Sequence, residues 1–236
     1  MSRVKARETS AGRLHRFLCD GAGDDDVAVE LAGWLTSSRR FRAFAEAHRD
    51  KIRKKLRTAA EAESRRDVRA ELRVAHLLLA DRRIHLAFEA YGSTKGGPDF
   101  SVALHSGRPC NVEVTRLHGT PTYRALAATV LGKLRQLPPS VPNILVIATE
   151  EATSGDIGEA MTALRTLVDA NDDAFLASRG LPGKRAFHDR LRRLGAVIVW
   201  CETAAGDARA VAWANGTARI SPPESVVRAC LATLRA

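Results

Sequence analysis

The sequence lacks the long apolar stretches that membrane-spanning and secreted proteins need. No run of about 18 apolar residues occurs, which argues against a membrane-spanning helix. The start of the chain, MSRVKARETSAGR, also lacks the apolar stretch of a secretory signal. We therefore expect a cytoplasmic protein with no membrane partner.

Cysteines are few, and they are scattered along the chain. The four are Cys19, Cys110, Cys201 and Cys230. Their spacing fits no zinc-binding motif. Together with the expected cytoplasmic location, this pattern indicates reduced and mostly buried thiols.

Glycine motifs that bind nucleotides are missing as well. The chain contains no Gly-x-Gly-x-x-Gly sequence. The glycine-rich loop at residues 92–97 lacks the Gly-x4-Gly-Lys-Ser/Thr spacing of a P-loop. These absences disfavour an α/β enzyme that binds a nucleotide or a dinucleotide cofactor.

Positive charge, by contrast, is in excess. The chain has 37 Lys and Arg against 27 Asp and Glu, a formal net charge of +10, which favours a polyanion as partner. Residues 48–57 are densely basic, and Arg53, Lys54 and Lys55 can neutralise phosphates from a single helix. A basic helix face can equally be solvated without a partner, and charge alone does not decide between the two.

Alternation of apolar and polar residues predicts two short strands between residues 98 and 115. The apolar members of the pattern are Phe100, Val102, Leu104, Val112 and Val114. Gly107 and Pro109 mark a turn between the two runs. Two half-buried strands joined by a short turn are therefore expected.

Asp99 and Glu113 both fall away from the apolar face of these strands. Successive side chains of a strand point to opposite faces, so the two carboxylates can meet on neighbouring strands. Carboxylates brought together repel each other unless a cation or a proton lies between them. Oxygen ligands of this kind suit Mg²⁺ or Mn²⁺.

Pro98-Asp99 followed by Glu113-Val114-Thr115 resembles the motif of the PD-(D/E)XK nuclease superfamily, which has the restriction-endonuclease-like fold. The resemblance covers residues 65–148 as an order of elements: helix, three strands, helix, strand. It implies phosphodiester hydrolysis with Mg²⁺ or Mn²⁺ held by Asp99, Glu113 and the backbone carbonyl of Val114. Thr115 stands where the family usually has lysine; it can donate a hydrogen bond but has no charge.

Glu71 is a second acidic candidate. Helical periodicity over residues 59–81 places it in the middle of an apolar stripe. A carboxylate there is costly unless it is paired, hydrogen-bonded or near a metal. The resemblance implies a helical glutamate that assists the metal site, whereas a buried salt bridge is the structural alternative.

Lys133 is the candidate for the missing lysine. It lies at the edge of the apolar stripe of a helix predicted over residues 121–137. Some nuclease families of this type carry the lysine on this helix, so we predict that Lys133 extends toward Glu113. Arg116, next to Thr115, is another cation that could serve. The alternative is a lysine whose stem lies along the rim of the core.

The predicted fold is an α/β mixed sheet flanked by helices, of the restriction-endonuclease-like type. Strands near 84–91, 98–104, 109–115 and 143–149 are expected to be neighbours. The last of these, NILVIAT, reads as a central strand buried on both faces. Residues 1–58 form an N-terminal helical extension in this scheme, with a break near Ser37–Ser38, and residues 59–236 form the nuclease domain.

The predicted function is a Mg²⁺- or Mn²⁺-dependent endonuclease-like hydrolase acting on nucleic acid, DNA rather than RNA. Arg53, Lys54, Lys55 and Arg116 are the predicted nucleic-acid contacts. The sequence does not decide between a monomer and a homodimer. The alternative is a catalytically lapsed nuclease fold that serves as a nucleic-acid-binding or assembly module. The uncharged Thr115 favours that alternative. The repelling carboxylates argue against it, because they would weaken binding to phosphates.

Overall fold

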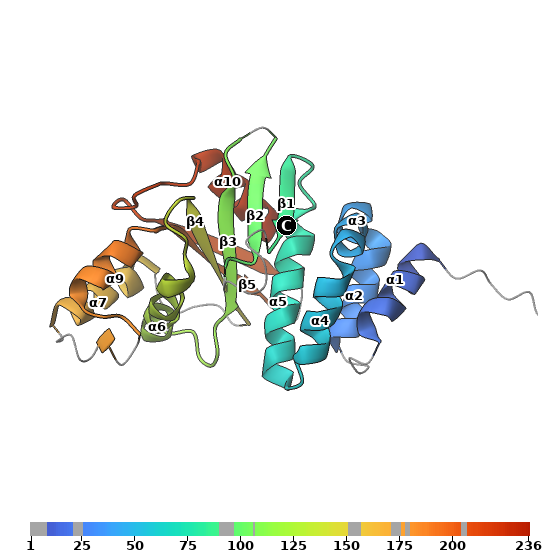
Figure 1. The fold of residues 1–236 in the computed structure, drawn as a ribbon, viewed down its shortest axis with the longest axis horizontal. Helices are drawn as coiled ribbons and strands as arrows, with labels where there is room; N and C mark the ends of the chain where they lie inside the picture. Colours follow the sequence, from blue (N-terminus) through green and yellow to red (C-terminus); the bar gives the residue numbers. More distant parts are fainter. Residues whose placement is uncertain are drawn as a thin grey trace, which may run out of the picture. The chain divides into compact units, whose positions relative to one another are not determined.

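The chain divides into two compact units, Met1–Ala80 and Asp81–Ala236. The computed structural model describes residues 9–20, 26–89, 97–105, 107–150, 157–170, 176–177, 180–203 and 207–236. Figure 1 shows helices in the first unit and a sheet with its helices in the second. The assignment of residues 59–236 to one nuclease domain stays a prediction.

The described part of the N-terminal unit is helical. Its helices are α1 (Ser10–Cys19), α2 (Asp26–Ser37), α3 (Arg39–Ala47), α4 (Arg49–Thr58) and α5 (Ala62–Leu78). The Ser38 hydroxyl caps α3 by accepting a hydrogen bond from the Phe41 backbone amide at 3.1 Å. The predicted break near Ser37–Ser38 is confirmed, and a second break at His48 separates α3 from α4.

Aromatic side chains hold the N-terminal helices together. The Trp34 ring of α2 lies edge to face with Phe41 of α3, with ring centroids 5.9 Å apart. Trp34 also stacks on His76 of α5 at 5.6 Å. Aromatic pairs of this geometry add roughly 0.5–1.5 kcal/mol beyond the area they bury. Helix α5 is thereby packed onto the helices that precede it.

A six-stranded mixed sheet forms the centre of the C-terminal unit. Its strands, in spatial order, are β1 (Ile84–Phe88), β2 (Phe100–Leu104), β3 (Cys110–Arg116), β4 (Asn143–Thr149), β5 (Leu194–Glu202) and β6 (Ala208–Ala214). Strands β1 to β3 are antiparallel, β3 to β5 are parallel, and β6 is antiparallel to β5. The predicted α/β class and the predicted neighbourhood of the first four strands are confirmed.

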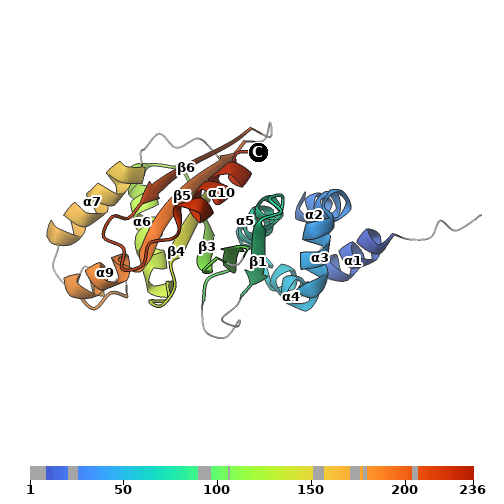
Figure 2. The same cartoon turned by 90° about the horizontal axis from the view of Figure 1, so that it is seen from above.

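Helices cover the two faces of this sheet (Figure 2). They are α6 (Tyr123–Lys133), which continues into the short 3-10 helix η1 (Leu134–Gln136), α7 (Ile157–Ala170), α9 (Lys184–Leu191) and α10 (Glu224–Leu234). Helices α6, α7 and α9 share one apolar cluster with β4 and β5. Helix α10 packs against β6, β5 and β2. Among the helices of the described residues, none combines the length and apolarity that a membrane crossing requires.

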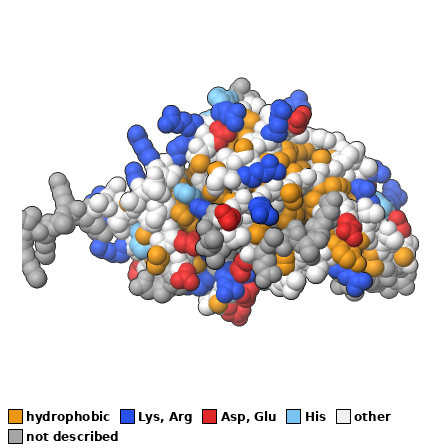
Figure 3. Space-filling view, turned by 180° about the vertical axis from the view of Figure 1, so that it is seen from behind, with side chains coloured by type: hydrophobic (Ala, Val, Ile, Leu, Met, Phe, Trp, Pro, Cys, Tyr) orange, Lys and Arg blue, Asp and Glu red, His pale blue; other side chains and the backbone are white. Residues whose placement is uncertain are grey.

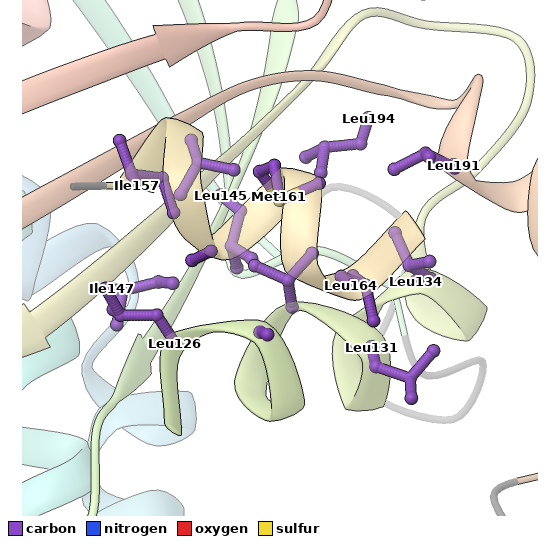
Figure 4. Packing of buried hydrophobic residues seen from close by; sticks show 14 of the residues in the cluster. Leu126, Leu131, Leu134, Leu145, Ile147, Ile157, Met161, Leu164, Leu191 and Leu194 are labelled. Atoms are coloured by element: carbon purple, nitrogen blue, oxygen red, sulfur yellow. The ribbon is translucent and has the colours of Figure 1, made fainter. Parts of the chain in front are cut away.

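The apolar cluster fixes α6 on the sheet. Figure 4 shows Leu126 of α6 beside Ile147 of β4, with α7 contributing Met161 and Leu164. All four side chains are almost completely buried. Burial of a leucine or isoleucine side chain stabilises a fold by about 1.5–3 kcal/mol. The position of α6 matters because its last residue is Lys133.

Two buried asparagines join the parallel strands β3 and β4. Asn111 Nδ2 donates to Asn143 Oδ1 at 2.9 Å. Asn143 Nδ2 lies within hydrogen-bond distance of the carbonyl oxygens of Pro138, Val141 and Arg193, at 2.8–2.9 Å. Both asparagines are 1% exposed, so these contacts satisfy amides that would otherwise be buried at a cost.

Candidate active site

Asp99 immediately precedes β2, and Glu113 lies on the neighbouring strand β3. Phe100 of β2 pairs with Val112 of β3 in the antiparallel register. Continued by one residue, that register would set Asp99 opposite Glu113, where side chains of an antiparallel pair share one side of the sheet. Glu113 itself contacts Lys133 of α6, so its side chain lies on the face that carries this helix.

Asp99 is held by the backbone on both sides. The Val114 amide donates to Asp99 Oδ2 at 2.9 Å. The Asp99 carbonyl accepts from the Glu89 amide at 2.7 Å, just after the end of β1. Glu89 has φ 45°, a left-handed conformation that is uncommon for a residue with a side chain. One oxygen of the Asp99 carboxylate is thus committed to a backbone contact that fixes the side chain against β3.

Glu113 is paired with Lys133. Lys133 Nζ donates to Glu113 Oε1 at 2.8 Å. The Glu113 side chain is 6% exposed and that of Lys133 is 25% exposed. In such a setting, removal of one partner leaves a buried charge and costs about 3–5 kcal/mol. The prediction that Lys133 extends to Glu113 is confirmed as a contact, while its catalytic role stays a prediction.

The local sequence explains why Lys133 points at the sheet. Helix α6 begins after Thr122, whose hydroxyl accepts from the Ala125 amide at 3.2 Å. Buried Leu126 and Val130 precede Lys133 by seven and three residues, so all three share one side of the helix. The apolar contacts of the first two therefore carry the lysine toward β3.

The side chains of Thr115 and Arg116 lie on opposite faces of the sheet. Thr115, two residues after Glu113, is half-buried and belongs to the same face. Arg116 belongs to the other face and is 7% exposed. Its guanidinium lies 3.4 Å from Glu150 Oε1 and 3.3 Å from His118 Nδ1. The predicted nucleic-acid contact of Arg116 stays a prediction.

The Arg116 partners were missed by reasoning from the sequence. His118 and Glu150 come from two separate turns, after β3 and after β4. Neither turn has a periodic pattern that would indicate its partner. The parallel pairing of Arg116 with Ala148, two residues before Glu150, brings the turns together.

Glu71 and the predicted basic contacts Arg53, Lys54 and Lys55 belong to the N-terminal unit. Lys55 Nζ lies 2.5 Å from Glu71 Oε2, which supplies the ion pair that a carboxylate in an apolar stripe requires. Arg53 pairs with Asp20, and its guanidinium lies 4.6 Å from the centre of the Phe17 ring. Lys54 is exposed. The predicted approach of Glu71 to Asp99 stays a prediction.

The donor set of the sheet fits a hard divalent cation by its chemistry. Asp99 and Glu113 offer carboxylates, and Asp99 contacts the backbone of Val114, the residue that follows Glu113. No group of three or more His, Cys, Asp or Glu that could hold a metal occurs among the described residues. A metal here would have few protein ligands and several waters, which is the pattern that Mg²⁺ accepts.

Basic side chains do not gather over the face of the protein drawn in Figure 3. Blue Lys and Arg side chains lie there among hydrophobic and neutral ones. The formal charge of +10 therefore does not locate a nucleic-acid surface on that face by itself. The location of such a surface has to come from particular side chains.

Comparison with known proteins finds no matching family model, no matching curated protein and no matching solved structure. The functional argument therefore depends on three side chains of the C-terminal unit. These are Asp99, which accepts from the Val114 amide of β3, and Glu113 of β3, which pairs with Lys133 of α6.

Proposed function

We propose that this protein is a metal-dependent nuclease that hydrolyses phosphodiester bonds of DNA, built on a restriction-endonuclease-like fold. The observation that carries the proposal is the contact of Lys133 with Glu113, on the strand position that faces Asp99. The spatial order β1-β2-β3-β4, with β1 to β3 antiparallel and β4 parallel to β3, supports it as well.

The residues have separate parts in this proposal. Asp99, Glu113 and the Val114 carbonyl would hold the metal. Lys133 balances Glu113 until nucleic acid binds, and then faces the scissile phosphate. There its ammonium orients the attacking water and stabilises the charge that develops in the transition state. Thr115 adds a hydrogen bond on the same face.

Mg²⁺ or Mn²⁺ at this place supplies Lewis acidity and a bound water of lowered pKa. The chain contributes the positioning. The Val114 amide holds the Asp99 carboxylate against β3. The packing of α6 holds Lys133 against Glu113. Both side chains are therefore positioned near β3 before any substrate arrives.

A lapsed nuclease fold that only binds nucleic acid is the second candidate. Thr115 favours it, because the third strand has no cation at the usual position. The lysine contact with Glu113 weighs against it, since α6 supplies a cation on the same face. The two candidates differ in whether a divalent metal produces cleavage.

The test is incubation of the full chain with single- and double-stranded DNA and RNA, with and without Mn²⁺. We expect cleavage of DNA that requires Mn²⁺ and disappears in Asp99→Ala. Asp169→Ala, which removes an exposed carboxylate of α7, is the matched control and should cleave normally. No Mn²⁺-dependent cleavage of any substrate, or full activity of Asp99→Ala, would contradict the proposal. Cleavage of RNA alone would refute the preference for DNA.

A further inference from the structure

A cavity of about 540 Å³ lies within the N-terminal unit. Helices α1 and α3 and the first residue of α4 line it. Its volume falls in the range of roughly 300–1,000 Å³ that is typical of ligand sites. The charged and aromatic side chains on its wall are Arg13, Phe17, Arg39, Arg42, Glu46 and Arg49.

Positive charge dominates this cavity. Within the described part of the chain, four arginines and one acidic residue, Glu46, line it. Glu46 pairs with Arg49 at 3.2 Å, but both side chains are more than half exposed, so that pair stabilises little. Guanidinium groups brought close together repel one another, and an anion between them relieves that repulsion. The wall is therefore suited to a negatively charged ligand.

Two of the four guanidinium groups are held in place. Arg42 Nη1 donates to the Leu35 carbonyl at 2.9 Å. The Arg49 guanidinium lies 5.2 Å from the centre of the Phe17 ring. Arg13 and Arg39 lie on the exposed part of the wall. A planar guanidinium can give two parallel hydrogen bonds to phosphate oxygens, and a held one loses less freedom on binding.

We propose that this cavity, the arginine pocket, binds the phosphodiester backbone of nucleic acid. The inference rests on the proposed nuclease function for the identity of the polyanion. It also revises where the basic contacts lie. Arg53 and Lys55 are engaged by Asp20 and Glu71, whereas four arginines line the pocket beside Glu46 among the residues that the structure describes.

The experiment measures binding of a fluorescein-labelled DNA duplex to the full chain by fluorescence anisotropy, in EDTA and over a series of salt concentrations. Arg13→Gln/Arg39→Gln should weaken binding about tenfold or more. In this variant, the slope of log affinity against log salt concentration should also be shallower by about 2. Each lost phosphate contact reduces that slope by about 1. Both substituted arginines are exposed, so the fold should persist.

Arg57→Gln/Arg66→Gln is the matched control. It removes the same charge from exposed positions of α4 and α5 that do not line the pocket. This variant should keep nearly the affinity and the salt dependence of the parent protein. Equal losses in the two double variants would overturn the pocket, because general charge would then explain the binding.

The pocket and the nuclease proposal can fail separately. Selective loss of binding in Arg13→Gln/Arg39→Gln supports the pocket even if Mn²⁺ produces no cleavage. Mn²⁺-dependent cleavage with unchanged binding in that variant overturns the pocket alone. Inorganic phosphate provides a further arm: displacement of the duplex beyond the effect of ionic strength would overturn backbone binding in favour of a small anion.

Discussion

Lys133 brings a cation to the third strand from a different element of the fold. The third strand places Glu113 and Thr115 on one face and has no cation there. Helix α6 supplies the cation, 2.8 Å from the Glu113 carboxylate. The lysine could be found from the sequence because it borders an apolar stripe, which fixes its direction. The proposed catalytic role of Lys133 follows from this contact and from the lack of a charge on Thr115.

Replacement of Lys133 tests that role. Lys133→Ala should lower the single-turnover rate of Mn²⁺-dependent DNA cleavage by about 10² or more, because a contact to transition-state charge is lost. Affinity for the duplex should change little, since one substrate contact is a small part of the total. Measurement of both quantities on the same preparation separates the two effects.

Lys133→Arg is the companion variant. It keeps the charge but replaces a compact ammonium by a planar fork, so rescue should be poor. A thermal unfolding curve for each variant shows whether Glu113 still folds into its buried place. Cleavage by Lys133→Ala at the parent rate would remove the lysine from the mechanism and direct attention to Thr115 and Arg116.

The buried cysteines give a prediction about pH. Burial raises the pKa of Cys110 to about 11 and that of Cys230 to about 12, from an ordinary value of 9.0. At pH 8 iodoacetamide should therefore label half-buried Cys19 before either of them, as mass spectrometry can determine. Rapid labelling of Cys230 in the folded protein would show that the thiol is accessible.

The same shifts link stability to pH. A folded-state pKa above the unfolded one favours folding while the thiol is protonated, so this stability is complete below pH 9.0. It is lost as pH rises from there through about 11 and about 12. Urea midpoints measured at several alkaline pH values should fall over this range, and they should fall less in Cys230→Ala. Equal slopes in both proteins would contradict the assignment.

Strand pairing depends on polar contacts as well as on the apolar core. Asn143 begins β4, and its side chain bridges β3, the turn before β4 and the residue before β5. These contacts hold the parallel strands in register at the end opposite to Thr115 and Arg116. Gly195 of β5 packs closely here, since a Cβ atom there would lie 2.4 Å from Pro222 Cδ.

Asn143→Ala tests the importance of this bridge. The variant should lose roughly 2–4 kcal/mol of unfolding free energy, because buried carbonyl oxygens and the Asn111 amide lose their partner. Urea denaturation followed by circular dichroism measures the change. Ser140→Ala, in the exposed part of the preceding turn, is the control and should stay close to the parent protein. A loss in Asn143→Ala no greater than that of the control would contradict the account.

Elements with a clear period were predictable from the sequence. Alternation placed β2 and β3, the continuous run NILVIAT placed β4, and the 3.6-residue period placed α6 and α5. Ends were less accurate: α5 was expected over 59–81 and spans Ala62–Leu78, because helix ends depend on individual caps. The asparagine bridge and the Arg116 partners left no signal, since both depend on contacts between distant turns.

Both units of the molecule carry excess positive charge. Residues 1–80 contain 18 Lys and Arg against 12 Asp and Glu, and residues 81–236 contain 19 against 15. The larger excess is in the helical unit, which also contains the arginine pocket. The proposed division of labour follows from this distribution: the N-terminal unit binds the nucleic-acid backbone, and the C-terminal unit carries the facing carboxylates and Lys133.

The most direct test of the account is Mn²⁺ binding to the full chain, measured by electron paramagnetic resonance of free Mn²⁺. The account predicts saturable binding by the parent protein, with loss of affinity in Asp99→Ala. It also predicts tighter binding by Lys133→Ala, because the ammonium no longer competes for Glu113. Equal Mn²⁺ affinity of Asp99→Ala and the parent protein would contradict the claim that these facing carboxylates form a metal site.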